Sequence, residues 1–230
     1  SITEVEKRAV RDSAEQAGAK EVYLIHEPMA AALGIGIDVE EPVGNMIIDI
    51  GGGTTGITVI ALAGIVCDQS IRIAGDEFTA DIMEALRRYH SLLIGERTAE
   101  QIKIQIGAAM KDLDNPPDDI PVNGRDLVTG IPKQIMVSFQ EIAEALDKSI
   151  FKIEEAILKA LETTPPELAA DIYRRGLYIT GGGALLRGLD KRLSQKIKLP
   201  VHVADDPLKS VVRGTGIALK NYDRYPFVMR

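Results

Sequence analysis

Two runs of three glycines are the residues in this chain best suited to chemistry. Gly51–Gly53 follows the apolar stretch 46–50, and Gly181–Gly183 follows the apolar stretch 177–180. Glycine lets a backbone approach a ligand closely, and successive amide groups in such a turn form a concave site for anions. One run alone is more often only a tight turn. Two runs, each at the end of an apolar strand, favour phosphate binding.

Polar side chains flank the first glycine run. Asp49 stands at the end of the preceding strand, beside the turn, and Thr54 and Thr55 come directly after the run. A carboxylate in this place can hold a hydrated Mg²⁺, because this ion keeps several of its waters and bridges phosphates. The first run therefore predicts a site for magnesium and phosphate.

Two other phosphate-binding motifs are excluded. Gly51, Gly53 and Gly56 satisfy the letters G-x-G-x-x-G, but the dinucleotide-binding fold needs a helix directly after the glycines. The stretch 57–60, Ile-Thr-Val-Ile, is β-branched and predicts a strand instead. The mononucleotide P-loop is absent, because no glycine is followed by Lys-Ser or Lys-Thr.

The spacing of apolar residues predicts the elements that carry these loops. Strands are expected at 21–25, 46–50, 55–61, 64–73, 176–180 and 200–204, and helices at 3–17, 27–37, 78–89, 99–110, 142–161, 167–175, 184–196 and 209–220. The three or four residues between 46–50 and 55–61 predict an antiparallel hairpin. Asn123-Gly124 predicts a second hairpin turn. Alternating strands and helices at both ends, with a mixed insertion between them, indicate an α/β core with an inserted subdomain.

Composition narrows the class of protein. The 230 residues are 45% hydrophobic, which excludes a chain that is disordered throughout. Their net charge of −7 argues against a general nucleic-acid binder. The single cysteine, Cys67, excludes a disulfide framework and fits a reducing cytoplasm. No apolar run approaches the roughly 20 residues of a membrane-spanning helix. Thr3 and Glu6 fit a helix capping box at the very start, so we expect a longer intact protein.

Several motifs bring a family into view. DIGGGTT from Asp49, RIAGDE from Arg72 and ITGGGALLRGL from Ile179 closely resemble the superfamily of actin, chaperone and sugar-kinase ATPases. EPMAAA from Glu27 and TTPPEL from Thr163 resemble, within it, the MreB family of bacterial actin-like cell-shape proteins. The resemblance extends from residue 2 to about residue 220.

This resemblance implies a role for each matching residue. Asp49 would organise Mg²⁺ through its waters, while Glu27 and Thr54 would position and polarise the water that attacks the γ-phosphate. Glu100 and Lys103 resemble the pair that holds the ribose. The backbone positions implied to hold ATP or ADP are Gly51, Gly52, Gly53, Thr54 and Thr55 at the β- and γ-phosphates, with Gly181, Gly182, Gly183 and Gly214 against the rest of the nucleotide.

Each side chain also has a simpler interpretation. Glu27 precedes Pro28, so it could be an acid favoured by the positive end of a helix. Glu100 and Lys103 are spaced i, i+3 and could be an exposed helix pair worth a few tenths of a kcal/mol. Thr54 could be only a turn residue.

The fold implied by the resemblance is α/β: an actin-like ATPase fold with a ribonuclease-H-like mixed sheet and an inserted α+β subdomain, comprising the second lobe and part of the first. The expected divisions are 1–37 in the first lobe with the crossing helix, 38–71 with the phosphate loop, 72–175 as the inserted subdomain, 176–212 with the adenosine loop, and 213–230 returning to the first lobe. The superfamily clamps phosphates between two loops, and we expect the other loop before Ser1. Gly56 replaces the acidic residue usual in the family.

The function implied is an ATPase that polymerises head to tail into filaments and directs rod cell shape and cell-wall synthesis. Its implied partners are copies of itself, the inner face of the cell membrane and cell-wall elongation proteins, in the cytoplasm and without nucleic acid. Three alternatives stay open: a chaperone-like ATPase, a sugar-kinase-like ATPase, and a nucleotide-binding scaffold without turnover.

Overall fold

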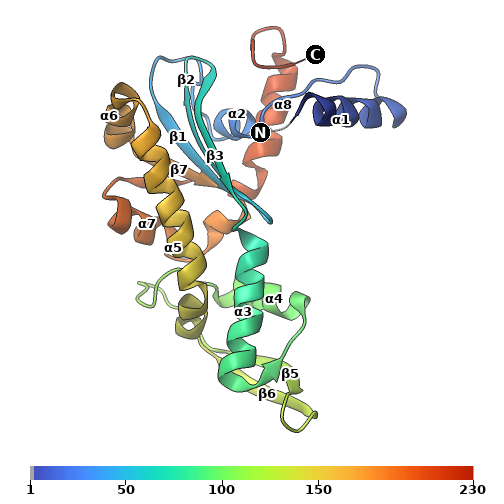
Figure 1. Ribbon diagram of the computed structural model, residues 1–230, viewed down its shortest axis with the longest axis vertical. Helices are drawn as coiled ribbons and strands as arrows, with labels where there is room; N and C mark the ends of the chain where they lie inside the picture. Colours follow the sequence, from blue (N-terminus) through green and yellow to red (C-terminus); the bar gives the residue numbers. More distant parts are fainter. Residues whose placement is uncertain (1–2, 230) are drawn as a thin grey trace.

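The computed structural model describes residues 3–229 and contains two β-sheets (Figure 1). The larger sheet has the strand order β3-β2-β1-β7-β8, and the smaller has the order β4-β5-β6. The strands are β1 (Asn45–Ile50), β2 (Thr55–Ala61), β3 (Gly64–Ile71), β4 (Leu92–Leu93), β5 (Ile120–Asp126), β6 (Pro132–Val137), β7 (Leu177–Thr180) and β8 (Val201–Val203). The predicted antiparallel hairpin of β1 and β2 is confirmed, and β7 lies parallel to both β1 and β8.

Strand β1 is apolar along its length because both of its faces are covered. Met46, Ile48 and Ile50 belong to the core on one side of the sheet, whereas Ile47 belongs to the core on the other. Successive side chains of a strand alternate between faces. Asp49 therefore shares the face of Ile47, one residue before the end of β1.

Helices cover the two faces of this sheet (Figure 1). On the face of Ile47 lie α2 (Glu27–Gly34) and α8 (Ser210–Lys220). The other face packs against α5 (Phe139–Thr163), α6 (Pro166–Arg175) and α7 (Leu189–Ile197). Helices α2 and α8 touch through their backbones, since a Cβ atom on Gly214 would lie 1.7 Å from the carbonyl oxygen of Ala30.

The lower part of the molecule in Figure 1 contains α3 (Gly75–His90), α4 (Glu96–Ile106) and the small sheet. Helix α5 runs from this part up along the large sheet. Arg192 of α7 links α5 to the segment after α4. Its Nε donates to Glu154 of α5 at 2.6 Å, and its Nη1 donates to the carbonyl of Ala109 at 3.0 Å. Glu154 is buried, so this charge pair fixes α5 against α7.

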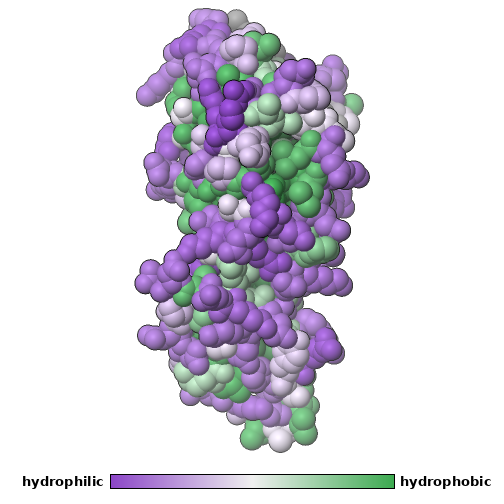
Figure 2. All heavy atoms as spheres, turned by 90° about the vertical axis from the view of Figure 1, so that its left-hand side faces the viewer, coloured by the Kyte–Doolittle hydropathy of each residue, from purple (hydrophilic) through white to green (hydrophobic). Residues whose placement is uncertain are grey.

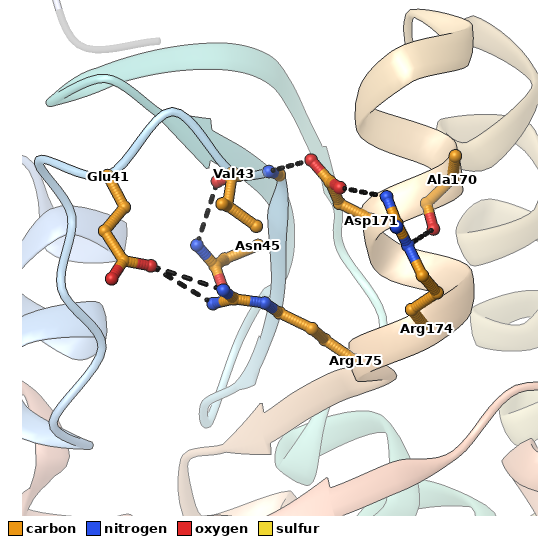
Figure 3. Close-up of polar contacts among 8 residues, drawn as sticks. Glu41, Val43, Asn45, Ala170, Asp171, Arg174 and Arg175 are labelled. Carbon is orange, nitrogen blue, oxygen red and sulfur yellow. Dashed lines mark hydrogen bonds and ion pairs between the residues drawn. The ribbon is translucent and has the colours of Figure 1, made fainter.

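Helix α6 is tied to the start of β1 by polar contacts (Figure 3). The carboxylate of Asp171 accepts from the Gly44 amide at 3.0 Å and from Arg174 at 2.9 Å. Arg175 reaches Glu41 on the segment before β1. A Cβ atom on Gly44 would lie 2.8 Å from Leu168, so only glycine lets α6 approach this closely. This cluster holds the end of β1 that lies opposite the glycine turn.

Helix α1 (Glu4–Gln16) begins with the predicted capping box, in which Thr3 and Glu6 bond reciprocally. None of its residues is buried. It projects at the upper right of Figure 1, away from the sheets. No helix among residues 3–229 is both long enough and apolar enough to cross a bilayer.

The outer surface of α5, α6 and α7 is mostly hydrophilic, as Figure 2 shows on the face that corresponds to the left of Figure 1. Buried positions of α5, such as Ile142, Leu146 and Ile150, recur every four residues and face the core. This spacing is what predicts the helix. The structure extends it from the expected 142–161 to Phe139–Thr163.

The predicted hairpin turn at Asn123-Gly124 is wrong. Both residues lie inside β5, and the connection to β6 falls at 127–131. Gly124 is needed there for space, since a Cβ atom would lie 2.7 Å from the carbonyl oxygen of Leu93 on the neighbouring strand. The turn is stabilised by Asp126, whose carboxylate accepts from the amides of Val128 and Thr129.

Two other predicted elements are corrected. The strand expected at 21–25 is reduced to one bridge, between Leu24 and Met229, because no second strand of the described chain runs beside it. The helix expected at 184–196 is divided into a 3₁₀ turn, η1 (Gly182–Leu185), and α7. Between them the chain is extended and pairs with the segment after α4, through the bridge of Ala108 with Arg187.

Candidate functional site

The two glycine turns meet at one edge of the large sheet. Because β1 and β7 are parallel and Asp49 is aligned with Thr180, both strands end side by side. Gly181 has a φ of +80°, and a Cβ atom there would lie 2.4 Å from Oδ1 of Asp49. A Cβ atom on Gly183 would lie 2.2 Å from the side chain of Ile50. The second turn therefore packs its backbone directly onto the end of β1.

The first glycine turn exposes free amide groups. The Gly51 amide closes the turn by donating to the Thr54 carbonyl at 3.0 Å, so it is not free. The amides of Gly52, Gly53 and Thr54 donate to no group within residues 3–229. Adjacent free amides in a tight turn can bind an anion. Three of the five positions expected to contact phosphate thus have a free amide.

The start of α3 supports this turn from below. The amides of Gly75 and Asp76 donate to the carbonyls of Gly51 and Gly52 at 3.0 and 2.8 Å. Thr55 is fully buried, and its hydroxyl donates to the Ile73 carbonyl at 2.6 Å. The Thr55 hydroxyl thus holds the turn in place, whereas the side chain of Thr54 is exposed.

Asp49 is a half-buried carboxylate without a hydrogen-bond donor among residues 3–229. Burial, and to a smaller extent the negative charge of Glu27, raise the pKa of Asp49 to about 6. A carboxylate left unsatisfied in this way fits a cation, because a nearby positive charge favours the ionised form. Within the described part of the chain, no three acidic, histidine or cysteine residues cluster to hold a metal. A Mg²⁺ ion held by Asp49 would therefore take its other ligands from water and phosphate, as this ion commonly does.

Glu27 is placed within electrostatic reach of Asp49. It is the first residue of α2, ahead of Pro28, and its side chain is exposed. Its negative charge contributes to the raised pKa of Asp49. This arrangement is compatible with a role toward a ligand and also with a helix-terminal acid.

Glu100 and Lys103 form an ion pair of 2.6 Å on α4. The Nζ of Lys103 also donates to the Gly75 carbonyl at 2.8 Å and to the Thr79 hydroxyl at 3.0 Å. Burial raises the pKa of Glu100, but bonds from Lys103 and Thr79 outweigh this, so its pKa is lowered. The pair is thus anchored to the helix that supports the first glycine turn.

The second glycine turn is anchored to the segment before α8. The Gly181 amide and the Thr180 hydroxyl both donate to the Pro207 carbonyl, each at 3.1 Å. Exposed Leu208 follows, and a Cβ atom on Gly182 would lie 3.2 Å from its side chain. Gly214 lies further along α8, buried at the crossing with α2, where it allows the backbone contact with Ala30.

Two residues of the site were missed from the sequence. The carboxylate of Asp76 lies close to the first turn, with Oδ1 3.5 Å from where a Cβ atom of Gly52 would be. Thr79 bridges α3 to the Glu100–Lys103 pair. Thr79 carries no local sequence signal for this role, because only the fold brings α3 beside α4.

The comparison with protein families now identifies the chain. Residues 1–226 match the family model described as MreB/Mbl protein. The chain belongs to the MreB/Mbl family. It is 48% identical over 226 residues to the cell shape-determining protein Mbl of Bacillus subtilis, covering 98% of this chain and 67% of the relative. It is 50% identical over 226 residues to the cell shape-determining protein MreB of Escherichia coli, covering 97% of this chain and 64% of the relative.

Solved structures agree with this family. The crystal structure of MreB5 of Spiroplasma citri bound to ADP is 40% identical, with a TM-score of 0.93 over 97% of this chain and 67% of that chain. The predicted actin-like fold of the MreB family is therefore confirmed. The chain spans about two thirds of the length of the MreB/Mbl relatives that it matches.

Proposed function

We propose that the intact protein is an actin-like ATPase that binds ATP and ADP with Mg²⁺ and polymerises into filaments. The observation that carries this proposal is the meeting of two glycine turns beside an unsatisfied carboxylate, Asp49, at one sheet edge. Its related protein MreB5 has been crystallised with ADP and with AMPPNP, and these structures share 40% of their sequence with this chain.

In this proposal each part of the site does one task. The free amides of Gly52, Gly53 and Thr54 would bind the β- and γ-phosphates, and Asp49 would hold Mg²⁺ through water. When bound, the ion neutralises phosphate charge. Glu27 and the Thr54 hydroxyl orient the attacking water. Phosphoryl transfer depends mainly on such positioning and on charge stabilisation.

The second turn and α4 hold the nucleoside. Gly181, Gly182 and Gly183 let the backbone pass close to the nucleotide, and Glu100 faces the ribose with Lys103 beside it. The structure gives Gly214 a packing contact, so in this proposal it acts by placing α8 against α2.

Filament formation follows from the family to which the chain belongs. Copies would associate head to tail, a contact that does not close on itself and so extends into a filament. The filaments would lie in the cytoplasm at the inner face of the membrane, together with cell-wall elongation proteins, and would direct rod cell shape and cell-wall synthesis.

Wild-type protein tests filament formation, and replacing Glu27 by alanine tests the hydrolysis step. The wild-type intact protein is expected to pellet on centrifugation with ATP and Mg²⁺ and to release phosphate. Glu27→Ala is expected to bind ATP and to pellet normally, because Glu27 lies outside the phosphate turn. Its phosphate release is expected to be roughly 10²-fold slower, the scale for losing a positioned base.

Pelleting, equilibrium ATP binding and single-turnover phosphate release should be measured on the same preparations. Glu21→Ala is a suitable control, since this acid lies on the segment before α2 and is not a site residue in the proposal. Wild-type protein that binds ATP and stays monomeric at all concentrations would contradict the filament. Unchanged turnover in Glu27→Ala would remove Glu27 from the site.

A further inference from the structure

The ammonium group of Lys103 has no donor left for a ligand. Its three protons match three acceptors: the Gly75 carbonyl at 2.8 Å, the Thr79 hydroxyl at 3.0 Å and Oε2 of Glu100 at 2.6 Å. Its side chain is only 15% exposed. Lys103 therefore links α4 to the first turn of α3 through hydrogen bonds.

Thr79 contacts both members of the Glu100–Lys103 pair. Its hydroxyl is 4% exposed and lies 3.0 Å from the Gly75 carbonyl and 2.8 Å from Oε2 of Glu100. A hydroxyl carries a single proton. The Gly75 carbonyl already accepts from Lys103, and an ionised carboxylate is the stronger acceptor, so the proton of Thr79 goes to Glu100.

One oxygen of Glu100 is consequently fixed and the other is free. Oε2 accepts from Lys103 and Thr79, whereas Oε1 has no partner within residues 3–229. The Glu100 side chain is 46% exposed, so Oε1 is available to a ligand. An ionised carboxylate oxygen only accepts hydrogen bonds, so Oε1 suits a ligand group that donates one, such as a hydroxyl.

The same turn of α3 also supports the phosphate-binding amides. Gly75 accepts from Lys103 with its carbonyl and donates to the Gly51 carbonyl with its amide. The position of Oε1 is thus tied to the position of the first glycine turn through a short path of hydrogen bonds. The groups that would bind the ribose and the phosphates of one nucleotide are thus held at a fixed separation.

We infer that Thr79 is a positioning residue for ribose recognition. With Lys103 it fixes Oε1 of Glu100, relative to the turn of Gly51–Gly53, as the acceptor for a ribose hydroxyl. This inference rests on the proposed nucleotide binding and adds that ribonucleotides are distinguished from nucleotides without ribose hydroxyls.

The test compares the binding of ATP and of 2′,3′-dideoxyATP to the intact protein by calorimetry. Wild-type protein is expected to favour ATP by roughly tenfold or more, the scale of one hydrogen bond to a charged group. Thr79→Val keeps the shape but removes the hydroxyl, and it is expected to bring this ratio toward one by weakening the binding of ATP more than that of dideoxyATP. Thr79→Ser keeps the hydroxyl and is expected to restore the ratio.

Thr79→Ala provides a second variant without the hydroxyl and with less bulk, in case valine disturbs folding, and thermal melting identifies folded samples. A ratio that is unchanged in the folded variant would overturn the inference, as would an equal loss of affinity for both nucleotides. Wild-type protein that binds both nucleotides equally would overturn it as well, while leaving the nucleotide site intact. Wild-type protein that binds neither nucleotide would instead contradict the proposed function, and the inference with it.

Discussion

Asp49→Asn is expected to make the ligand-free protein more stable and to remove most of its Mg²⁺-dependent stabilisation by ATP. Burial and the charge of Glu27 raise the pKa of Asp49 from 3.8 to about 6, so the ionised carboxylate destabilises the folded chain at neutral pH. The neutral amide of asparagine avoids this cost. After a discount for solvent screening, the substitution should raise the free energy of unfolding by about 1–2 kcal/mol, which corresponds to a rise of roughly 2–8 °C in Tm.

The pH dependence fixes the sign of this effect. The folded chain holds the Asp49 proton more tightly than the unfolded chain, so the contribution of Asp49 to stability is fully present below pH 3.8. It is lost as the pH rises to about 6. The stability advantage of Asp49→Asn should therefore be small at pH 3.8 and below, grow as the pH rises to about 6, and stay nearly constant at higher pH.

Thermal melting of wild type and Asp49→Asn across this pH range, with and without ATP and Mg²⁺, measures both effects. Asp126→Asn is the matched control, because backbone hydrogen bonds from Thr129 and Val128 lower the pKa of Asp126 to about 2. Its substitution should lower the melting temperature. An Asp49→Asn protein that is less stable than wild type at pH 7.5 would contradict this account of the site.

Gly214→Ala is expected to destabilise the protein strongly, whereas Gly216→Ala, two residues further along the same helix, is not. A Cβ atom on Gly214 would lie 1.7 Å from the carbonyl oxygen of Ala30, so α8 would have to move away from α2. We expect a loss of about 3 kcal/mol or more in the free energy of unfolding. Gly216 is exposed, and a Cβ atom there would have no neighbouring atom within 4 Å. Because alanine favours the helix over glycine, Gly216→Ala should raise the free energy of unfolding by up to about 1 kcal/mol.

Urea unfolding of the two variants beside wild type measures this difference directly. The two substitutions share their chemistry and their helix, so the difference between them isolates the contact with α2. Equal effects at both positions would show that α2 and α8 do not meet through Gly214.

The sequence predicts well those parts of the fold that depend on periodic burial. The continuous apolar run of β1, the short hairpin to β2 and the four-residue repeat of Ile142, Leu146 and Ile150 each follow from one local rule, and each is present. The resemblance to the MreB family, which rests on the glycine runs and their neighbours, is likewise confirmed by the family match.

The errors arise where distant segments decide the local structure. Gly124 resembles a turn residue, but it lies within β5 because Leu93 approaches it from another strand. The helix expected after Gly183 is interrupted because Arg187 pairs with residues far earlier in the chain. The hydrogen bond from Lys103 to Thr79 was missed for the same reason, since only the fold brings α3 beside α4.

Calorimetric titration of the intact protein with ATP, with and without Mg²⁺, tests the central claim most directly. The meeting of the two glycine turns at Asp49 predicts one nucleotide bound per chain, with tighter binding when Mg²⁺ is present. Absence of binding, or equal affinity with and without Mg²⁺, would contradict it.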